Sequence, residues 1–156
     1  MLAFMSKDTA KITSTNILTS DSSTIGNYYN STFDLNRGKY AQNSNLRNPW
    51  NNFDKALGSI VVSNETTGKM KKTEQSSSPN SILLTTGGTE QSKIMNIYDV
   101  AGNASEWTLE KTSSTDNPCA SRGGSIGFRG FERPAVDRRR NTTVDNAYIG
   151  FRVSLF

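Results

Sequence analysis

The sequence predicts a loop-rich α+β domain with short antiparallel strands and a small core. Two features of its composition support this class: only 33% of the 156 residues are hydrophobic, while aromatic residues make up an ordinary 9%. A third feature is that short β-branched or apolar runs alternate with stretches rich in Asn, Ser, Thr and Gly. Since no repeat or linker divides the chain, we expect a single domain over residues 1–156.

The beginning of the chain has a short apolar helical face at residues 1–8. This segment lacks the basic n-region and long apolar h-region of a secretory signal. It looks like the tail of an amphipathic helix, so we expect the chain to be the C-terminal part of a longer protein. No segment approaches the roughly 20 apolar residues of a membrane-spanning helix, and the sequence therefore predicts no membrane insertion.

The elements expected in the first half are short. Residues 26–33 bring aromatic side chains together and predict an irregular packed segment, whereas residues 43–52 predict a loop. The β-branched run at residues 58–63 predicts a strand. The serine-rich, basic stretch at residues 64–80 predicts an exposed loop, after which the apolar run at residues 81–86 resumes the core.

The second half is expected to contain two glycine-containing turns and two strands. Residues 101–103 predict a turn, and residues 106–110 predict the strand that follows it. A second glycine-rich turn is expected after residues 121–124. Residues 148–156 predict a final strand at the edge of the core.

The charge, cysteine and histidine content limits the chemistry. The formal net charge is +4, and the excess is concentrated in six arginines that are accompanied by only two acidic residues. These arginines are Arg122, Arg129, Arg133, Arg138, Arg139 and Arg140. Such a patch binds phosphate, nucleic acid or an acidic partner, or is simply a solvated surface that aids solubility. Cys119 is the only cysteine and histidine is absent, which removes the commonest general base and transition-metal ligand.

Three segments in the second half carry a family resemblance. Residues 97–107 are Ile-Tyr-Asp-Val-Ala-Gly-Asn-Ala-Ser-Glu-Trp, and Arg-Gly-Gly-Ser at 122–125 and Ile-Gly-Phe-Arg-Val at 149–153 follow in order. Together they resemble the C-terminal signature of the formylglycine-generating-enzyme, or sulfatase-modifying-factor, superfamily. The resemblance covers residues 95–156 and implies a C-type-lectin-like fold. The chain departs from the family at Ser105, where an aromatic residue is usual, and keeps Trp107.

The resemblance also implies a calcium site in the turn before Trp107. Carried over by position, the ligands are the side chains of Asp99 and Glu106 and the backbone carbonyls of Gly102 and Ala104, which are hard oxygen donors. The alternative is that Asp99 caps the turn and Glu106 pairs with an arginine. No cofactor is required by either interpretation.

The family's copper chemistry is not expected here. Formylglycine-generating enzymes bind copper with a pair of cysteines after the Gly-Gly-Ser element, but residues 125–131 contain none and Cys119 precedes the glycines. Cys119 is either a thiol activated near Arg122 or an inert buried residue. We therefore expect a non-catalytic binding module with no catalytic residues. The alternative function is a homologue that lost the cysteine pair or performs an unidentified reaction.

The end of the chain is similar to the variable proteins of diversity-generating retroelements, which share the lectin-like fold. In those proteins, adenine-directed copying of asparagine codons yields many residue types but never Lys, Gln, Glu, Met or Trp. Between Ser125 and Tyr148 that excluded set appears once, as Glu132. The resemblance implies a phage-virion or bacterial-surface location and a protein or other surface ligand, which the arginines suggest is acidic. Nucleic-acid binding is the least favoured hypothesis because no recognised motif supports it.

The expected ligand-binding surface is drawn from the mixed arginine-aromatic stretch before the last strand. It comprises Ser125, Ile126, Phe128, Arg129, Phe131, Arg133, Val136, Asp137, Arg139, Arg140, Val144, Asp145, Ala147 and Tyr148. The competing interpretation places Phe128, Phe131 and Tyr148 in the core. The residues expected to belong to the supporting frame are Gly123, Gly124, Pro134, Gly150 and Phe151.

Overall fold

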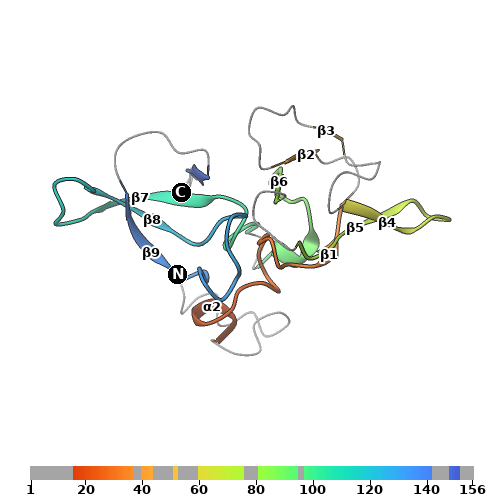
Figure 1. Ribbon diagram of the computed structural model, residues 1–156, viewed down its shortest axis with the longest axis horizontal. Coiled ribbons are helices and arrows are strands. Elements are labelled where there is room, and N and C mark those ends of the chain that lie inside the picture. Colours follow the sequence, from red (N-terminus) through yellow and green to blue (C-terminus); the bar gives the residue numbers. More distant parts are fainter. Residues whose placement is uncertain are drawn as a thin grey trace.

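The computed structural model describes residues 16–36, 40–43, 51–52, 60–75, 81–94, 97–141 and 148–151. Within these ranges the fold consists of small, mostly antiparallel sheets with little helix (Figure 1). The described helical turns are α2 (Asn16–Thr19) and the 3-10 turn η2 (Glu90–Ser92). This mixed, loop-rich architecture is compatible with the predicted α+β class and equally with a mainly-β fold. No described helix is long and apolar enough to cross a membrane.

The largest sheet has four strands in the order β10-β7-β8-β9. Its strands are β7 (Ser105–Lys111), β8 (Cys119–Arg122), β9 (Arg138–Asn141) and β10 (Ile149–Gly150). The pairs β7–β8 and β8–β9 are antiparallel, whereas β10 runs parallel to β7. The strand predicted at residues 106–110 is confirmed, and of the predicted final strand the described part contains only β10.

A second sheet has the order β1-β5-β4. It contains β1 (Phe33–Asp34), β5 (Lys69–Lys72) and β4 (Ile60–Asn64), all antiparallel to their neighbours. The strand predicted at residues 58–63 is confirmed from Ile60 onward, and residues 58–59 lie outside the described part. The exposed loop predicted at residues 64–80 is wrong at β5, because alternation along this strand buries Met70 and Lys72.

The third sheet has the order β3-β2-β6 and completes the described strands. It consists of β3 (Asn51–Asn52), β2 (Tyr40–Asn43) and β6 (Ile82–Leu84). The apolar run predicted at residues 81–86 is therefore confirmed as a strand. The loop predicted at residues 43–52 is wrong at its two ends, where Asn43 belongs to β2 and Asn51–Asn52 form β3.

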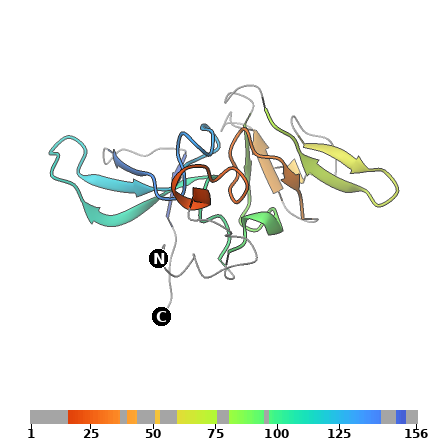
Figure 2. The ribbon, with the colours of Figure 1, turned by 90° about the horizontal axis from the view of Figure 1, so that it is seen from below.

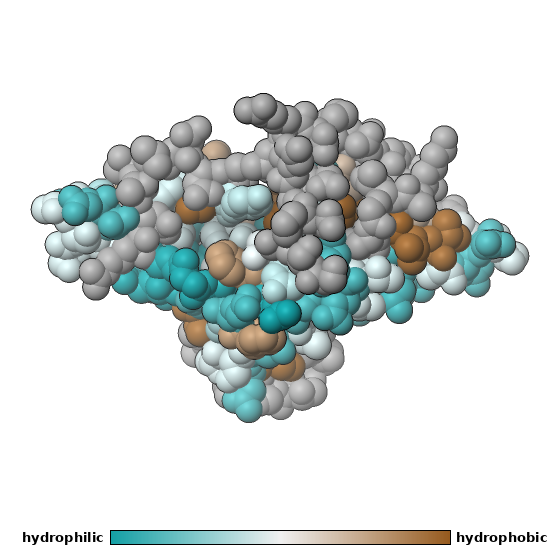
Figure 3. Space-filling view, viewed as in Figure 1, coloured by the Kyte–Doolittle hydropathy of each residue, from teal (hydrophilic) through white to brown (hydrophobic). Residues whose placement is uncertain are grey.

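Two hydrophobic clusters form the core. The first lies between the two three-stranded sheets and contains Phe33, Leu35, Ala41, Ile60, Met70, Ile82 and Leu84. The second lies beneath α2 and contains Leu18, Ile25, Tyr28, Ile94 and Ala101. The irregular aromatic segment predicted at residues 26–33 is confirmed, since Tyr28, Tyr29 and Phe33 are all buried. Around these clusters the described surface is mostly hydrophilic (Figure 3).

The predicted turn at residues 101–103 joins the parts of the molecule. Gly102 and Asn103 both have positive φ angles, of 66° and 60°. The Asn103 side-chain nitrogen donates to the Leu84 carbonyl at 2.8 Å, and its oxygen accepts the Leu84 N–H at 2.9 Å. The Asn27 side chain donates to Asn103 Oδ1 and to the Ile82 carbonyl. The buried side chains of Asn27 and Asn103 therefore link the turn before β7 to strand β6 of the three-stranded sheet β3-β2-β6.

Candidate functional site

The segment that contains most of the expected binding residues is irregular but firmly attached to the N-terminal part of the chain. The Tyr28 hydroxyl donates to the Arg133 carbonyl at 2.7 Å. The Ala135 N–H donates to Ser22 Oγ at 2.8 Å, and the Gly130 N–H donates to Asn30 Oδ1 at 3.1 Å. These bonds join residues 100 to 113 positions apart, so they fix the loop backbone without a regular element of its own.

The beginning of this segment is buried, and the expectation of a solvent-facing surface is wrong for Ser125 and Ile126. Ser125 is 2% exposed and Ile126 is 0% exposed. The Ile126 N–H donates to the Asn103 carbonyl at 3.1 Å, which draws the chain into the interior directly after Gly124. The Val136 side chain does not face solvent fully either, because it is partly buried against the second hydrophobic cluster. Its N–H donates to the Leu18 carbonyl.

Exposed arginine and aromatic side chains gather in the next part of the segment. The Arg129 guanidinium lies 5.4 Å from the centroid of the Tyr29 ring and 5.8 Å from that of Phe131. Phe131 is 54% exposed, and Arg129 is exposed as well. Cation–π distances of this size are within the range that stabilises such stacks. Arg129 therefore lies between a buried tyrosine ring and an exposed phenylalanine ring.

A second stack is centred on Phe128. The Arg133 guanidinium lies 5.0 Å from its ring centroid, and that of Arg139 lies 5.7 Å from it. Asp137 connects the two arginines, with Arg133 Nη1 3.8 Å from Oδ1 and Arg139 Nε 3.6 Å from Oδ2. These are ion pairs longer than hydrogen bonds, and Asp137 Oδ2 and Arg133 Nε have no hydrogen-bond partner. Burial raises the pKa of Asp137, and Arg133 only partly opposes the rise.

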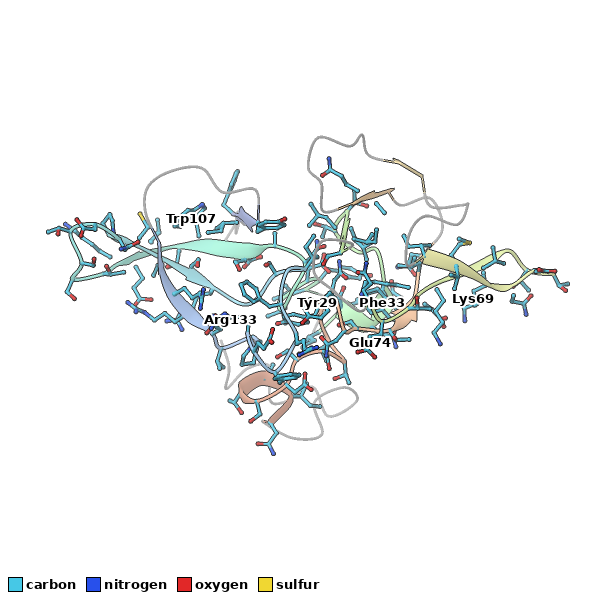
Figure 4. The ribbon with its side chains drawn as sticks, viewed as in Figure 1. Tyr29, Phe33, Lys69, Glu74, Trp107 and Arg133 are labelled. Atoms are coloured by element: carbon cyan, nitrogen blue, oxygen red, sulfur yellow. The ribbon has the colours of Figure 1, made fainter. Side chains whose placement is uncertain are left out.

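We refer to these two stacks together as the arginine–aromatic cluster. Its members are Tyr29, Phe128, Arg129, Phe131, Arg133, Asp137 and Arg139. The two stacks are adjacent, because the Tyr29 N–H donates to the Phe128 carbonyl at 3.3 Å. Figure 4 shows Tyr29 near the middle of the molecule, with Arg133 on the side toward the four-stranded sheet.

Two of the six clustered arginines of the sequence share one carboxylate on the sheet instead. Glu110 on β7 accepts from Arg122 at 3.1 Å and from Arg138 at 2.7 Å. The hydrogen bond from Arg138 is the main reason that the pKa of Glu110 lies below its ordinary value. Sequence reasoning did not single out Glu110, because its role depends on the pairing of β7, β8 and β9.

The remaining expected contact and frame residues are only partly described. Tyr148 is half-buried, and its carbonyl accepts the Ser105 N–H at 2.8 Å. The side chain of Arg140 and all of Val144, Asp145 and Ala147 lie outside the described residues. Phe151, expected in the supporting frame, is 78% exposed and therefore does not belong to the described core.

The residues expected to bind calcium lie on the turn before β7 and at the start of that strand. Asp99 Oδ2 accepts the Gly87 N–H at 3.3 Å, and Gly87 belongs to the turn after β6, not to the turn at residues 101–103. Among the described residues, no three acidic, histidine or cysteine side chains come together as a metal site. The carboxylates of Asp99 and Glu106 and the carbonyls of Gly102 and Ala104 are oxygen donors of the kind that calcium takes, and water normally completes its roughly six to eight ligands. Since the predicted set contains only two acidic side chains, the calcium site stays a prediction from the resemblance.

Lys72 is a buried lysine that was not predicted from the sequence, and it is hydrogen-bonded to the turn that carries Tyr29 of the cluster. Lys72 is fully buried, and its Nζ donates to the Tyr28 carbonyl at 2.6 Å and to the Ser31 carbonyl at 2.9 Å. It also lies 5.4 Å from the centroid of the Phe33 ring. Burial lowers the pKa of Lys72 to about 7, and Glu74 opposes this shift. Lys72 thereby fixes the turn that carries Tyr29.

The single thiol lies on β8, apart from these groups. Cys119 is half-buried and is paired in register with Asn141 of β9 and Lys111 of β7.

Comparison of the chain with protein-family models, with curated proteins and with solved structures found no match. The chemistry of the site therefore rests on the geometry described above.

Proposed function

We propose that this chain is a non-catalytic ligand-binding module, and that the arginine–aromatic cluster is its recognition surface. The observation that supports this most directly is the placement of Arg129 between Tyr29 and exposed Phe131. Aromatic and arginine side chains are the commonest energetic anchors of protein interfaces, since they combine apolar area with directional hydrogen bonds. We further propose that the frame beneath them is C-type-lectin-like.

The backbone of the cluster is well suited to recognition. The segment is held by a hydrogen bond donated by Tyr28 and by two that Ser22 and Asn30 accept, so little ordering should accompany binding. At the same time the exposed side chains of Arg129, Phe131 and Arg139 do not form the hydrophobic core. Substitutions at these three positions are therefore compatible with the fold, as expected for a variable protein of a diversity-generating retroelement.

The ligand class follows from how the arginines of this region are paired with carboxylates. Glu110 occupies Arg122 and Arg138, and Asp137 lies between Arg133 and Arg139 at ion-pair distances of 3.6 to 3.8 Å. Arg129 has only a loose pair with Glu132, at 3.8 Å. We propose an acidic protein surface that also offers an aromatic or apolar side chain, because the three arginines of the cluster are opposed only by Asp137 and Glu132 among the described ion pairs, and exposed Phe131 lies beside Arg129.

The proposal is tested with two labelled acidic polymers, poly-glutamate and a glutamate–tyrosine copolymer, in fluorescence anisotropy titrations. The copolymer should bind more tightly, and its binding should weaken as salt is added because ion pairs are screened. The double variant Arg129→Ala/Phe131→Ala should lose at least about tenfold in affinity, the size of one or two lost interface anchors.

The matched control is Lys111→Ala, which removes one exposed positive charge from β7 outside the cluster. It should bind the copolymer as the unmodified protein does. Equal loss in the control and the double variant would show that net charge alone drives binding and would contradict the proposed surface. Copolymer affinity that does not exceed that of poly-glutamate would contradict the proposed contribution of the aromatic rings.

A further inference from the structure

Strand β4 is an edge strand with apolar side chains exposed to solvent. Among the described strands it pairs only with β5. Val61 is 38% exposed and Val62 is 44% exposed. Consecutive strand residues point to opposite faces, so both faces of this strand carry an exposed β-branched side chain. Figure 3 shows hydrophobic residues on this arm.

The β4 edge lacks the charged residues that protect another sheet edge in this molecule, while its pairing with β5 shifts register between Val62 and Asn64. Exposed edges are normally guarded by charged residues or proline, because their free backbone groups recruit other strands. The described edge strand β9 follows this rule with three consecutive arginines at 138–140. In contrast, β4 consists of Ile-Val-Val-Ser-Asn and has neither charge nor proline. Among the described strands, β4 is therefore unpaired on this side and rich in residues that favour strand pairing.

The composition of β4 indicates which partner it fits. A two-fold axis beside an edge strand pairs that strand with its own copy in antiparallel orientation. Because β4 is uncharged, this pairing brings no like charges within the strand face to face, and in a register centred on Val62 the two Val62 side chains lie opposite one another. The nearby lysine Lys69 is neutralised by Asp34 at 2.7 Å, which removes one source of repulsion between the copies.

We propose that β4 joins a second copy of this chain through antiparallel edge-to-edge pairing, which forms a continuous sheet across the dimer. The arm formed by β4 and β5 extends away from the body, and its Lys69 lies far from Tyr29 and Arg133 (Figure 4). Figure 2 shows the same arm at one end of the molecule from another side. The second copy therefore reaches β4 without covering the arginine–aromatic cluster.

The interface is small, so the dimer should be weak. One five-residue strand pair with two exposed valines per copy falls below the roughly 1,000 Å² typical of stable complexes. We expect a monomer at low micromolar concentration and a growing dimer fraction as the concentration approaches the millimolar range.

Sedimentation velocity across that concentration range tests the proposal. The unmodified chain should shift from monomer to dimer, and Val62→Lys should remain a monomer, because it places like charges across the two-fold axis. Thr66→Lys is the matched control, since Thr66 is exposed in the turn of the same hairpin and the substitution adds the same charge. The control should dimerise normally.

A monomer at every concentration would overturn the proposal, as would a Val62→Lys variant that dimerises like the parent. Hydrogen exchange of the unmodified chain provides a second readout that needs no variant. Amides of residues 60–64 should gain protection as concentration rises, and unchanged exchange there would also overturn it. Neither measurement involves the acidic polymers, so failure of this dimer and failure of the proposed recognition surface are distinguishable.

Discussion

At the scale of single residues, Gln75 is a buried polar side chain without compensation. Both polar atoms of its carboxamide are buried and have no hydrogen-bond partner in the described part of the chain, while its backbone N–H donates to the Tyr29 carbonyl. An unsatisfied buried polar group costs about 1–3 kcal/mol. Gln75 follows β5 and is hydrogen-bonded to Tyr29, a member of the arginine–aromatic cluster. The free-energy cost of burying its side chain therefore arises next to the proposed recognition surface.

We expect Gln75→Leu to raise the free energy of unfolding by about 1–2 kcal/mol, since it removes two unsatisfied atoms at similar volume. Urea denaturation followed by circular dichroism measures this change. Gln75→Glu should instead lower stability, because it buries a carboxylate at the same position. A destabilised leucine variant would mean that the carboxamide has a partner in solution.

The buried amine of Lys72 and the buried phenol of Tyr28 predict a stability maximum at alkaline pH. Burial lowers the pKa of Lys72 from 10.5 to about 7, so between these values the unfolded chain binds more protons and stability rises with pH. Burial raises the pKa of Tyr28 above its ordinary value of 10.0, so stability declines once the unfolded tyrosine ionises. The melting temperature should therefore rise from neutral pH to about pH 10 and then fall.

Melting curves across this range, for the unmodified chain and Lys72→Met, check the assignment to Lys72. The methionine variant should lose the rise above neutral pH, and it should also be less stable overall, because the Tyr28 and Ser31 carbonyls lose their donor. A methionine variant with the same rise would assign the pH dependence to other groups.

At the scale of elements, the recognition segment depends on a close approach at Gly124. A Cβ atom on Gly124 would collide with the Arg133 carbonyl oxygen and with Cε1 of Tyr28, and would lie 2.9 Å from Arg133 Cβ. Gly127, three residues later in the same segment, has open space around it, since its nearest atom would be Ser125 Oγ at 3.8 Å. Alanine at Gly124 therefore introduces a steric clash, whereas alanine at Gly127 changes only the backbone freedom of the chain.

Gly124→Ala should destabilise the chain by about 1–3 kcal/mol, the usual cost of overpacking. It should also weaken binding to the glutamate–tyrosine copolymer, because Arg133 must move. Gly127→Ala should change stability by no more than about 0.5 kcal/mol. Thermal denaturation of both variants tests the pair, and similar losses in both would refute the tight contact at Gly124.

The sequence predicts elements well where local chemistry determines them. Strands β4, β6 and β7 were predicted because β-branched or apolar residues are consecutive or alternate there. Strand β5 was missed because its Lys-Met-Lys-Lys composition resembles a solvated loop. Only the distant carbonyls of Tyr28 and Ser31 make burial of Lys72 possible, and local patterns do not contain that information.

In the candidate site, too, predictions succeeded where residue type determines exposure and failed where distant contacts determine burial. Arg129, Phe131 and Arg139 were predicted as contact residues from their types alone, and the structure leaves them exposed. Ser125 and Ile126 were misassigned because their burial depends on the Asn103 turn, which is remote in sequence. The partnership of Tyr29 with Arg129 was not predicted, since it joins residues about a hundred positions apart.

At the scale of the whole molecule, two clusters of buried residues are joined by the paired side chains of Asn27 and Asn103. In Figures 1 and 2 the four-stranded sheet lies at one end and the hairpin of β4 and β5 at the other. The proposed recognition surface lies between these ends, on the segment that crosses from β8 to β9. Dimerisation through β4 and ligand binding therefore use separate parts of one molecule.

The projecting hairpin has a consequence for targets that present the same epitope repeatedly. Two chains coupled through it would carry two identical contact surfaces on a shared rigid axis. Once the first surface is engaged, the second meets its epitope at a raised effective concentration, and the avidity of the pair exceeds the affinity of either site. Regularly spaced coats, in which identical subunits recur, would then be held much more firmly than the same subunit free in solution.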